Sequence, residues 1–538
     1  MSKPGPGRRP GPTLLALIVV GIAFAADKPP AATRAKLPFT ISEGTTHITE
    51  PLRPDGAPDY AAALEAIASE GVTPENNAAV LYIKAIGPGE LAVEYRGPFF
   101  GSLGIEPVPD DGSYLIGYTA QSKAIADAAD PAPTEAEKER LAKQFDEQTE
   151  RAWSAPWSAE QLPLVAAWLE RNEKPLELIV AGTKRPRCYV PLSSAANEGP
   201  LLLIANINPI SFELRDAARL LTARAMLRLG EGKVAAANAD LLACHRLARH
   251  AAEGHFLSEW ITGNVIEAIA CNGDATLATS GKLSAEQALA YRAALEKLPP
   301  FPSTDQLFDR GERFTYLGAV LYVAMDAQKG KTEIYTQITD RTFPVAGIDW
   351  DIALRRGNEL FDEMVAAARA PTRAERRELN RESTAKFEKS LEADAKRPWL
   401  AIGRKLLAGR SLREQASDAV ANVLLIILLP AQGALFDAQD RAQMRLDLAR
   451  VALALAAYRA ERGGFPPELD KLAPKHIAAI PEDLFSGKPL IYRPAEDGSG
   501  YLLYSVGNNE QDDDARTYDS QPEGDDLVIR TPVPEAKP

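Results

Sequence analysis

The chain has 538 residues, of which 45% are hydrophobic and 25% are charged, and its formal net charge at pH 7 is −13. This length and balance are typical of a folded soluble protein with two or three domains. The acidic excess argues against nucleic acid or an anionic membrane surface as the partner, because binding either one requires a basic face that displaces counterions.

The N-terminus predicts an exported protein. Arg8 and Arg9 precede an apolar run over residues 14–26 that ends in small residues, which is the layout of a cleavable signal peptide. We assign residues 1–26 to the signal peptide and the Pro- and Ala-rich residues 27–39 to a linker, and we expect a periplasmic or secreted protein. The run is short for a membrane span, so a stable span is expected only if this segment stays uncleaved as an anchor.

Residues 40–429 are predicted to be mainly helical. We expect a mixed, mostly helical region over residues 40–205, with helices at 59–67, 74–86, 134–152 and 158–171 and one strand at 201–204. A helix array follows over residues 206–429, with helices at 212–229, 233–252, 256–279, 285–297, 303–328, 349–369, 372–396 and 416–429. Small residues around the Gly-rich link at 230–232 resemble one tetratricopeptide hairpin, but no 34-residue period supports a repeat solenoid.

No catalytic signature is present. The Gly-x-Ser-x-Gly, His-Glu-x-x-His, Walker and dinucleotide-binding motifs are all missing, so we predict no catalytic or cofactor-binding residues. Three central histidines are five residues apart, which turns each about 140° from the last and argues against a shared metal site on one helix: His245, His250 and His255. For the cysteines we consider either one disulfide between the second and third or three buried thiols: Cys188, Cys244 and Cys271.

The best-defined element is a helix over residues 434–462. It ends where Gly463 suits the left-handed position after a helix and two prolines follow. Just before it, residues 423–429 form an apolar run that is too short to cross a bilayer, which we interpret as a buried helix packing beside the long one. The apolar positions of the long helix recur at steps of four and three and form one stripe that must be buried: Met444, Leu448, Val451, Leu455 and Tyr458.

Three short strands are predicted after the long helix, at residues 490–492, 501–504 and 527–529. We expect Leu490, Leu503 and Val528 to share one sheet that leans on the buried stripe of the helix. A Gly-containing loop at 496–500 joins the first two strands as a hairpin. The connection between the second and third strands is long and strongly acidic.

The C-terminal pattern carries a family resemblance. It consists of the long helix followed by Gly463-Gly464-Phe465-Pro466-Pro467, Pro481 with Asp483, Gly487-Lys488-Pro489, Tyr504-Ser505-Val506-Gly507 and the Asp-rich loop. This order resembles the soluble domain of the type II secretion major pseudopilins, and it is similar to the tail of uncharacterised exported proteins of planctomycete-type bacteria. The resemblance covers residues 430–538, roughly the last fifth of the chain, and implies a small α+β domain with a long helix and about three antiparallel strands.

The same resemblance implies a metal site. The pseudopilin loop binds calcium, and the matching positions here are Asn509, Asp512, Asp514 and Asp526. Hard oxygen ligands at irregular spacing suit Ca²⁺, and a solvated loop without a metal is the alternative.

The chain departs from the family pattern at several positions. Leu484 stands where the family has a proline, Asn509 where it has an aspartate, and residues 515–523 replace the glycines that tighten the loop. The family's methylation signal and membrane helix are missing before residue 434. We therefore do not expect this chain to polymerise as a pilin.

Two functions from different classes follow from these features. The first is an exported, non-catalytic interaction or structural protein of the cell envelope, in which the helix array contacts an envelope or secreted protein and calcium steadies the C-terminal module. The second is an extracytoplasmic hydrolase, which requires a deep pocket with convergent Asp, Glu or His between Leu37 and Arg397. We prefer the first because it needs no unrecognised chemistry.

Overall fold

The computed structural model describes residues 36–89, 91–127, 134–192, 203, 208, 210–329, 347–395, 411–428 and 432–532. The predicted signal peptide, most of the linker and most of the predicted strand at 201–204 lie outside the described residues. The chain from Leu37 onward forms one compact unit.

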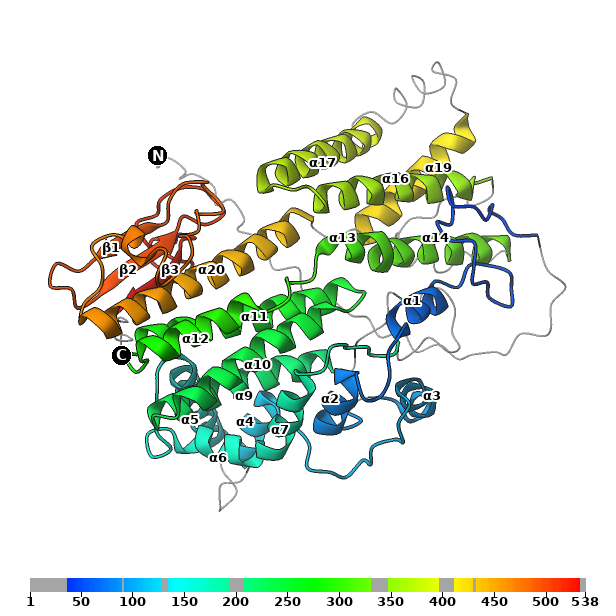
Figure 1. Cartoon of the computed structure of the whole chain (residues 1–538). Helices are drawn as coiled ribbons and strands as arrows, with labels where there is room; N and C mark the ends of the chain where they lie inside the picture. Colours follow the sequence, from blue (N-terminus) through cyan, green and yellow to red (C-terminus); the bar gives the residue numbers. More distant parts are fainter. Residues whose placement is uncertain are drawn as a thin grey trace, which may run out of the picture. The chain divides into compact units, whose positions relative to one another are not determined.

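The fold is mainly helical and ends in a small antiparallel sheet, as predicted (Figure 1). The first helices are α1 (Tyr60–Ser69), α2 (Ala78–Ile86), α3 (Val93–Leu103), α4 (Tyr118–Asp127), α5 (Glu135–Ser154), α6 (Pro163–Arg171) and α7 (Glu173–Gly182). The middle of the chain contains α9 (Ser211–Gly230), α10 (Val234–Ala252), α11 (Leu257–Thr279), α12 (Ala285–Glu296), α13 (Thr304–Gln306), the π-helix η1 (Leu307–Glu312) and α14 (Arg313–Gln328). The last helices are α16 (Trp350–Ala368), α17 (Arg373–Ala395), α19 (Leu412–Leu428), α20 (Gln432–Arg462) and the 3₁₀ turn η2 (Leu469–Leu472).

Helix starts follow the capping chemistry of the sequence. Thr134 forms a capping box with Glu137 at the start of α5. The predicted start of α2 at residue 74 was wrong by four residues, because the side chain of Asn77 accepts a hydrogen bond from the backbone N–H of Ala79 and caps the helix there. Residues 73–77 form a turn rather than the first turn of the helix: the backbone N–H groups of Asn76 and Asn77 donate to the carbonyl of Thr73.

The middle helices pack as close neighbours. Helix α10 lies against both α9 and α11, and α20 lies against α11 and α12. A glycine allows α10 and α11 to approach closely, because a Cβ atom at Gly263 would lie 2.5 Å from the carbonyl oxygen of Ala248. One continuous cluster of buried apolar side chains runs from α2 through α9–α12 to α20 and the sheet.

The C-terminal strands form one sheet in the order β1 (Ile491–Pro494), β2 (Tyr501–Ser505), β3 (Leu527–Thr531). Strands β2 and β3 contact α20, whose predicted stripe is buried except for the half-buried Tyr458. Val528 lies in β3 as expected, but the residue of β3 that faces the core is Ile529, and Leu490 is buried one residue before β1. Leu503 pairs with Ile529, and both are buried in the shared core, whereas Val528 pairs with Tyr504 on the opposite face.

Helix α19 packs differently from the prediction. It lies mainly on α14 and α16 rather than beside α20, and it buries Val420, Ala421, Leu424 and Leu425 in a second apolar cluster. The stretch Arg413–Arg462 is long and apolar enough to span a membrane by length and composition alone, and 47% of its most apolar window is buried within the structure. A single stretch of this kind is weak evidence of a membrane span, because the core helix of a soluble protein passes the same test of length and composition.

The sheet offers a matched pair of leucines for testing this packing. Leu503 is fully buried, whereas its neighbour Leu502 is half-buried on the other face. We expect Leu503→Ala to lower the free energy of unfolding by about 2–4 kcal/mol, because it leaves a cavity in the core. Leu502→Ala should cost less than about 1 kcal/mol in the same urea titration. Equal losses would contradict the assigned face.

Candidate functional site

The acidic connection between β2 and β3 is held at its first residues by Asp483. The Oγ of Ser505 donates to Oδ1 of Asp483 at 2.9 Å, and the backbone N–H of Val506 donates to Oδ2 at 3.0 Å. Gly507 follows with φ of 70° and passes so close to Asp525 that a Cβ atom would lie 2.2 Å from its carbonyl oxygen. This contact brings both ends of the connection together and requires glycine.

Three carboxylates converge in this connection. Oxygen atoms of Asp513, Asp525 and Asp526 all lie within 4.8 Å of one another. Asp525 and Asp526 are 8% and 2% exposed. Burial raises the pKa of Asp526 to about 6; the neighbouring aspartates Asp513 and Asp512 raise it further, whereas hydrogen bonds from backbone N–H groups lower it. Burial also raises the pKa of Asp525. The cluster therefore carries negative charge that the protein only partly neutralises.

The hydrogen bonds around the cluster leave one carboxylate oxygen without a partner. Oδ2 of Asp525 accepts from the backbone N–H of Asn509 at 3.0 Å, but its buried Oδ1 has no hydrogen-bond partner among the described residues. Asp526 accepts from the backbone N–H of Ala515 at 2.8 Å. Asp513 is paired with Arg516 at 3.3 Å, so that arginine neutralises one of the three acids. A cation beside Asp525 would satisfy the remaining oxygen.

The predicted ligands are only partly brought together. Asp526 belongs to the cluster, and Asn509 lies next to it, donating from Nδ2 to Asp513 at 2.8 Å. Asp512 instead accepts from the hydroxyl of Tyr504, and Asp514 pairs with Arg493 at 2.6 Å. Sequence reasoning missed Asp513 and Asp525, although both belong to the same two acidic runs. The ligand set implied by the resemblance stays a prediction.

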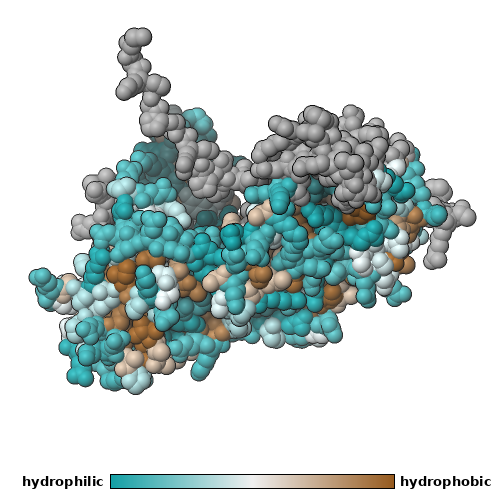
Figure 2. Space-filling view, turned by 90° about the horizontal axis from the view of Figure 1, so that it is seen from above, coloured by the Kyte–Doolittle hydropathy of each residue, from teal (hydrophilic) through white to brown (hydrophobic). Residues whose placement is uncertain are grey.

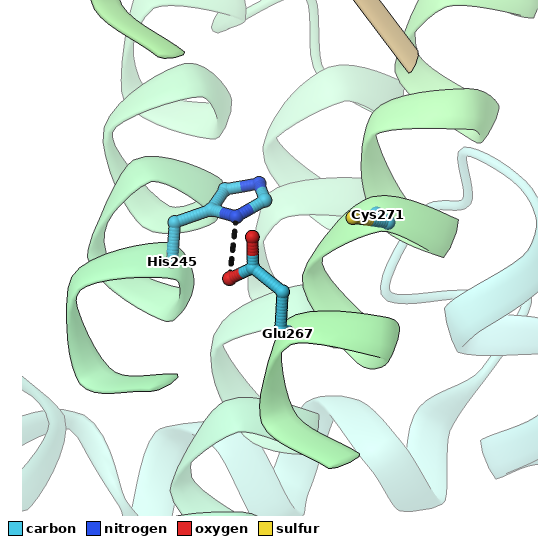
Figure 3. A group of neighbouring side chains, drawn as sticks. All are labelled: His245, Glu267 and Cys271. Carbon is cyan, nitrogen blue, oxygen red and sulfur yellow. Dashed lines mark hydrogen bonds and ion pairs between the residues drawn. The ribbon is translucent and has the colours of Figure 1, made fainter. Parts of the chain in front are cut away.

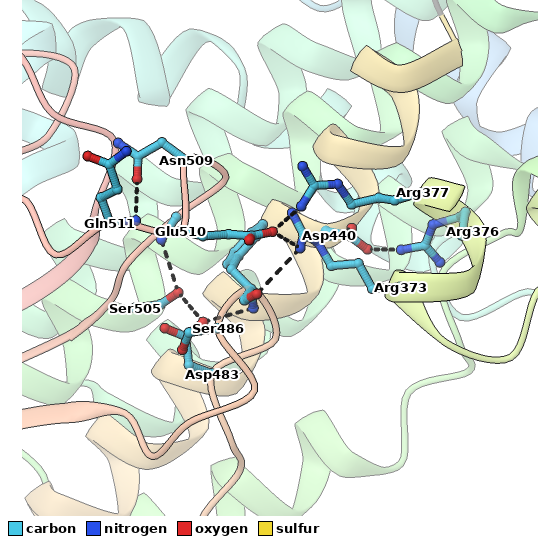
Figure 4. A network of polar contacts seen from close by, with 12 residues as sticks. Arg373, Arg376, Arg377, Asp440, Asp483, Ser486, Ser505, Asn509, Glu510 and Gln511 are labelled. Carbon is cyan, nitrogen blue, oxygen red and sulfur yellow. Dashed lines mark hydrogen bonds and ion pairs between the residues drawn. The ribbon is translucent and has the colours of Figure 1, made fainter. Parts of the chain in front are cut away.

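Arginines of α17 bind the acidic connection and α20 together (Figure 4). Arg373 pairs with Glu510 at 2.7 Å and with Asp440 of α20 at 3.1 Å. Arg377 also contacts Glu510, and Arg376 contacts Asp440. Glu510 adopts a φ of 61°, a conformation that non-glycine residues rarely take. These ion pairs fix the position of the loop that carries the aspartate cluster.

A second group that could hold a metal by distance is His245, Glu267 and Cys271 (Figure 3). His245 is fully buried, and its two ring nitrogens lie 3.0 Å from Glu267 and 2.8 Å from Asp274. Burial alone would lower the pKa of His245, but the two carboxylates raise it to about 9. The imidazole is therefore protonated at neutral pH and has no lone pair for a metal.

The neighbours of His245 complete a charge network between helices. Arg249 pairs with Glu267 at 2.9 Å, and the hydroxyl of Tyr291 donates to Asp274 at 2.6 Å. Burial raises the pKa of the Cys271 thiol well above its usual range, which keeps the sulfur protonated. We interpret this group as a structural link between α10, α11 and α12. All three cysteines are unpaired.

The His245 network predicts a pH-dependent stability. The folded-state pKa of His245 is about 9, which is above its ordinary value of 6.5. The contribution of His245 to the free energy of unfolding is therefore complete below pH 6.5 and is lost as pH rises through 9. We expect the free energy of unfolding to fall over this range by roughly 2–3 kcal/mol, measured by urea titration. His245→Gln should remove that slope, and the control His476→Gln should keep it. An unchanged slope in His245→Gln would contradict the assignment.

Comparison with known proteins adds no relative from which this site can be assigned. No family model matches the chain, and no curated protein or solved structure matches it. The resemblance to the pseudopilins therefore rests on the residues of this chain alone.

Proposed function

We propose that the chain is an exported, non-catalytic interaction protein of the cell envelope whose C-terminal module binds calcium. The observation that carries the proposal is the convergence of Asp513, Asp525 and Asp526, with a buried oxygen of Asp525 that has no hydrogen-bond partner among the described residues. Calcium takes six to eight hard oxygen ligands in flexible geometry, which an irregular loop of carboxylates and carbonyls supplies. Extracytoplasmic calcium is abundant enough for a weak site of this kind.

Calcium would also help to hold the acidic loop of the C-terminal module against α17. Glu510 lies between Asn509 and the aspartate cluster in sequence and pairs with Arg373 and Arg377 of α17. A bound cation that orders the cluster would therefore also hold Glu510 against α17. This link supports a docking role, because the loop and the helix array then present one continuous surface to an envelope or secreted partner.

The described residues on one face of the chain have the mixed composition of an interaction surface. On the face drawn in Figure 2, hydrophilic residues predominate and hydrophobic ones lie in small groups between them. Protein interfaces of moderate affinity have a similar mixed composition. The predicted signal peptide supports export, and the resemblance to the pseudopilins supports type II secretion or a related envelope system as the setting.

An extracytoplasmic hydrolase is the second candidate function, because one pocket with an acid and a histidine occurs between Leu37 and Arg397. A pocket of about 310 Å³ includes Glu267 and Asp440, but both acids are already paired with arginines, at 2.9 Å to Arg249 and 3.1 Å to Arg373. A second pocket, of about 350 Å³, contains Glu253 and His255. The second pocket is the observation that favours this candidate.

Calcium should stabilise the folded protein. At 5 mM calcium we expect the free energy of unfolding to rise by on the order of 1 kcal/mol, as for a site with a dissociation constant near 0.5 mM. The same concentration of magnesium should have a smaller effect, because magnesium demands a rigid octahedral site. Thermal and urea unfolding with and without each metal measure both effects.

Paired variants identify the ligands in the same assay. Asp513→Asn combined with Asp525→Asn should abolish the calcium effect, whereas Asp519→Asn, an exposed residue of the same loop, should keep it. A third protein carries Asp512→Asn and Asp514→Asn. If that pair alone abolishes the effect, the ligand set implied by the resemblance replaces the cluster. If calcium leaves the parent protein unchanged, the calcium proposal is wrong.

A further inference from the structure

A pocket of about 350 Å³ lies in the helical part, far along the chain from the acidic loop. Its walls come from four segments: the end of α1, the stretch containing Arg187 and Cys188, the link between α10 and α11, and residues 302–310 before and within η1. The volume is within the range of pockets that bind small molecules. None of the acids of the calcium proposal belongs to it.

The walls are fixed by specific contacts rather than by loose loops. The indole N–H of Trp260 donates to the carbonyl of Pro302 at 2.9 Å, and the backbone N–H of Leu257 donates to Glu312 at 3.0 Å. A Cβ atom at Gly311 would lie 1.6 Å from the carbonyl oxygen of His255, so only glycine lets η1 pack directly on the α10–α11 link. A π-helical turn is rare and frequently occurs at functional sites.

Two arginines of the pocket form no ion pair within the described residues, although Arg187 lies near enough to Glu253 to lower the pKa of that carboxyl. Arg310 of η1 forms no ion pair there, and Arg187 contacts only the carbonyl of Ala68, at 3.5 Å. Both are half-buried. Two partly desolvated guanidinium groups at one pocket favour an anion, which they bind with directional hydrogen bonds.

The remaining lining is apolar or uncharged. Ile67, which is 37% exposed, supplies apolar surface, whereas Trp260 lines the pocket but is only 1% exposed. His255 supplies a neutral ring, because burial and the nearby Arg310 lower its pKa to about 4. A neutral imidazole both donates and accepts a hydrogen bond. Burial raises the pKa of the Cys188 thiol well above its usual range, so this cysteine is not a nucleophile at neutral pH.

We infer that this pocket binds a small amphipathic carboxylate, whose anionic group pairs with Arg310 and Arg187 and whose apolar part lies against Ile67. The inference goes beyond the calcium proposal and is independent of it. Binding of such a ligand is also the first requirement of the hydrolase candidate, because a substrate must be held beside Glu253 and His255 before any group acts on it.

Glu253 makes the affinity depend on pH. It lies at the pocket wall, where burial raises its pKa to about 7, a rise limited by Arg187 and by the backbone N–H of Cys188. The other titratable or charged groups near it are His255, Arg310 and Cys188 of the pocket and Tyr82 of α2. An ionised Glu253 repels a carboxylate ligand, whereas the protonated form donates a hydrogen bond to it. Affinity should therefore rise as pH falls through 7.

Calorimetric titration of the full chain with benzoate and with its neutral isostere benzamide tests the site. We expect benzoate to bind the parent protein about tenfold more tightly than benzamide at pH 6. Arg310→Gln should weaken benzoate binding about tenfold and leave benzamide binding unchanged, whereas Arg140→Gln, an exposed arginine of α5, should change neither. Equal affinity for the two ligands in the parent protein, or equal effects of the two arginine variants, would overturn the inference.

A second variant guards against a folding defect in Arg310→Gln. Glu253→Gln removes the repulsive charge, so we expect tighter benzoate binding at pH 8 and the loss of the pH dependence between 6 and 8. Weaker binding in this variant, or an unchanged pH dependence, would contradict the role given to Glu253. Each titration is run with a calcium chelator, so that failure of the calcium proposal and failure of this one are read separately.

Discussion

The burial of α20 on two sides determines the arrangement of the C-terminal half of the chain. This 31-residue helix packs against α11 and α12 on one side and against β2 and β3 on the other. From Val451 to Ala457 every residue is buried, so neither face of the helix is free for water. Alanines at four of these seven positions allow the neighbouring helices to approach closely. The small sheet is therefore stabilised by the same core as the helix array, which a three-stranded sheet needs in order to be stable.

Buried ion pairs also connect α20 to the acidic loop through α17. Asp440 of α20 is 4% exposed and binds Arg373 and Arg376 of α17, while Arg373 also binds Glu510. Removing one member of such a buried network leaves an uncompensated charge and is costly. The loop that carries the aspartate cluster is thus held at Ser505 and Val506 by Asp483, which precedes β1, and at Glu510 by α17. A cation bound to the cluster would act on a loop whose position the fold has already set.

Much of the fold could be predicted from the sequence because the signals were local. The stop signal after Arg462 and the counted stripe of α20 gave a helix that the structure confirms, with its end at the same residue. The three strands and their antiparallel order followed from short runs of strand formers around a Gly-containing turn. Helix α3 was missed because Gly97, Pro98 and Gly101 lower helix propensity, which tertiary packing of Phe99 and Phe100 overrides.

The candidate sites were less predictable because they depend on which elements become neighbours. The spacing argument assumed that His245, His250 and His255 share one helix, but His255 lies in the link after α10. Nothing local showed that Glu267 and Asp274 of the next helix would face His245. In the acidic loop the direction of each carboxylate is set by irregular backbone, so the order of residues did not distinguish Asp513 from Asp512. The π-turn η1 arises from close packing of Gly311 on His255, which no sequence period reveals.

Native-state hydrogen exchange tests the shared core most directly. If α20 joins the sheet to the helix array, amides of β2 and of the middle of α11 exchange through the same global opening, with the same free energy and the same dependence on urea. Amides of β2 that exchange through a separate opening of lower free energy, while α11 stays protected, would contradict the account.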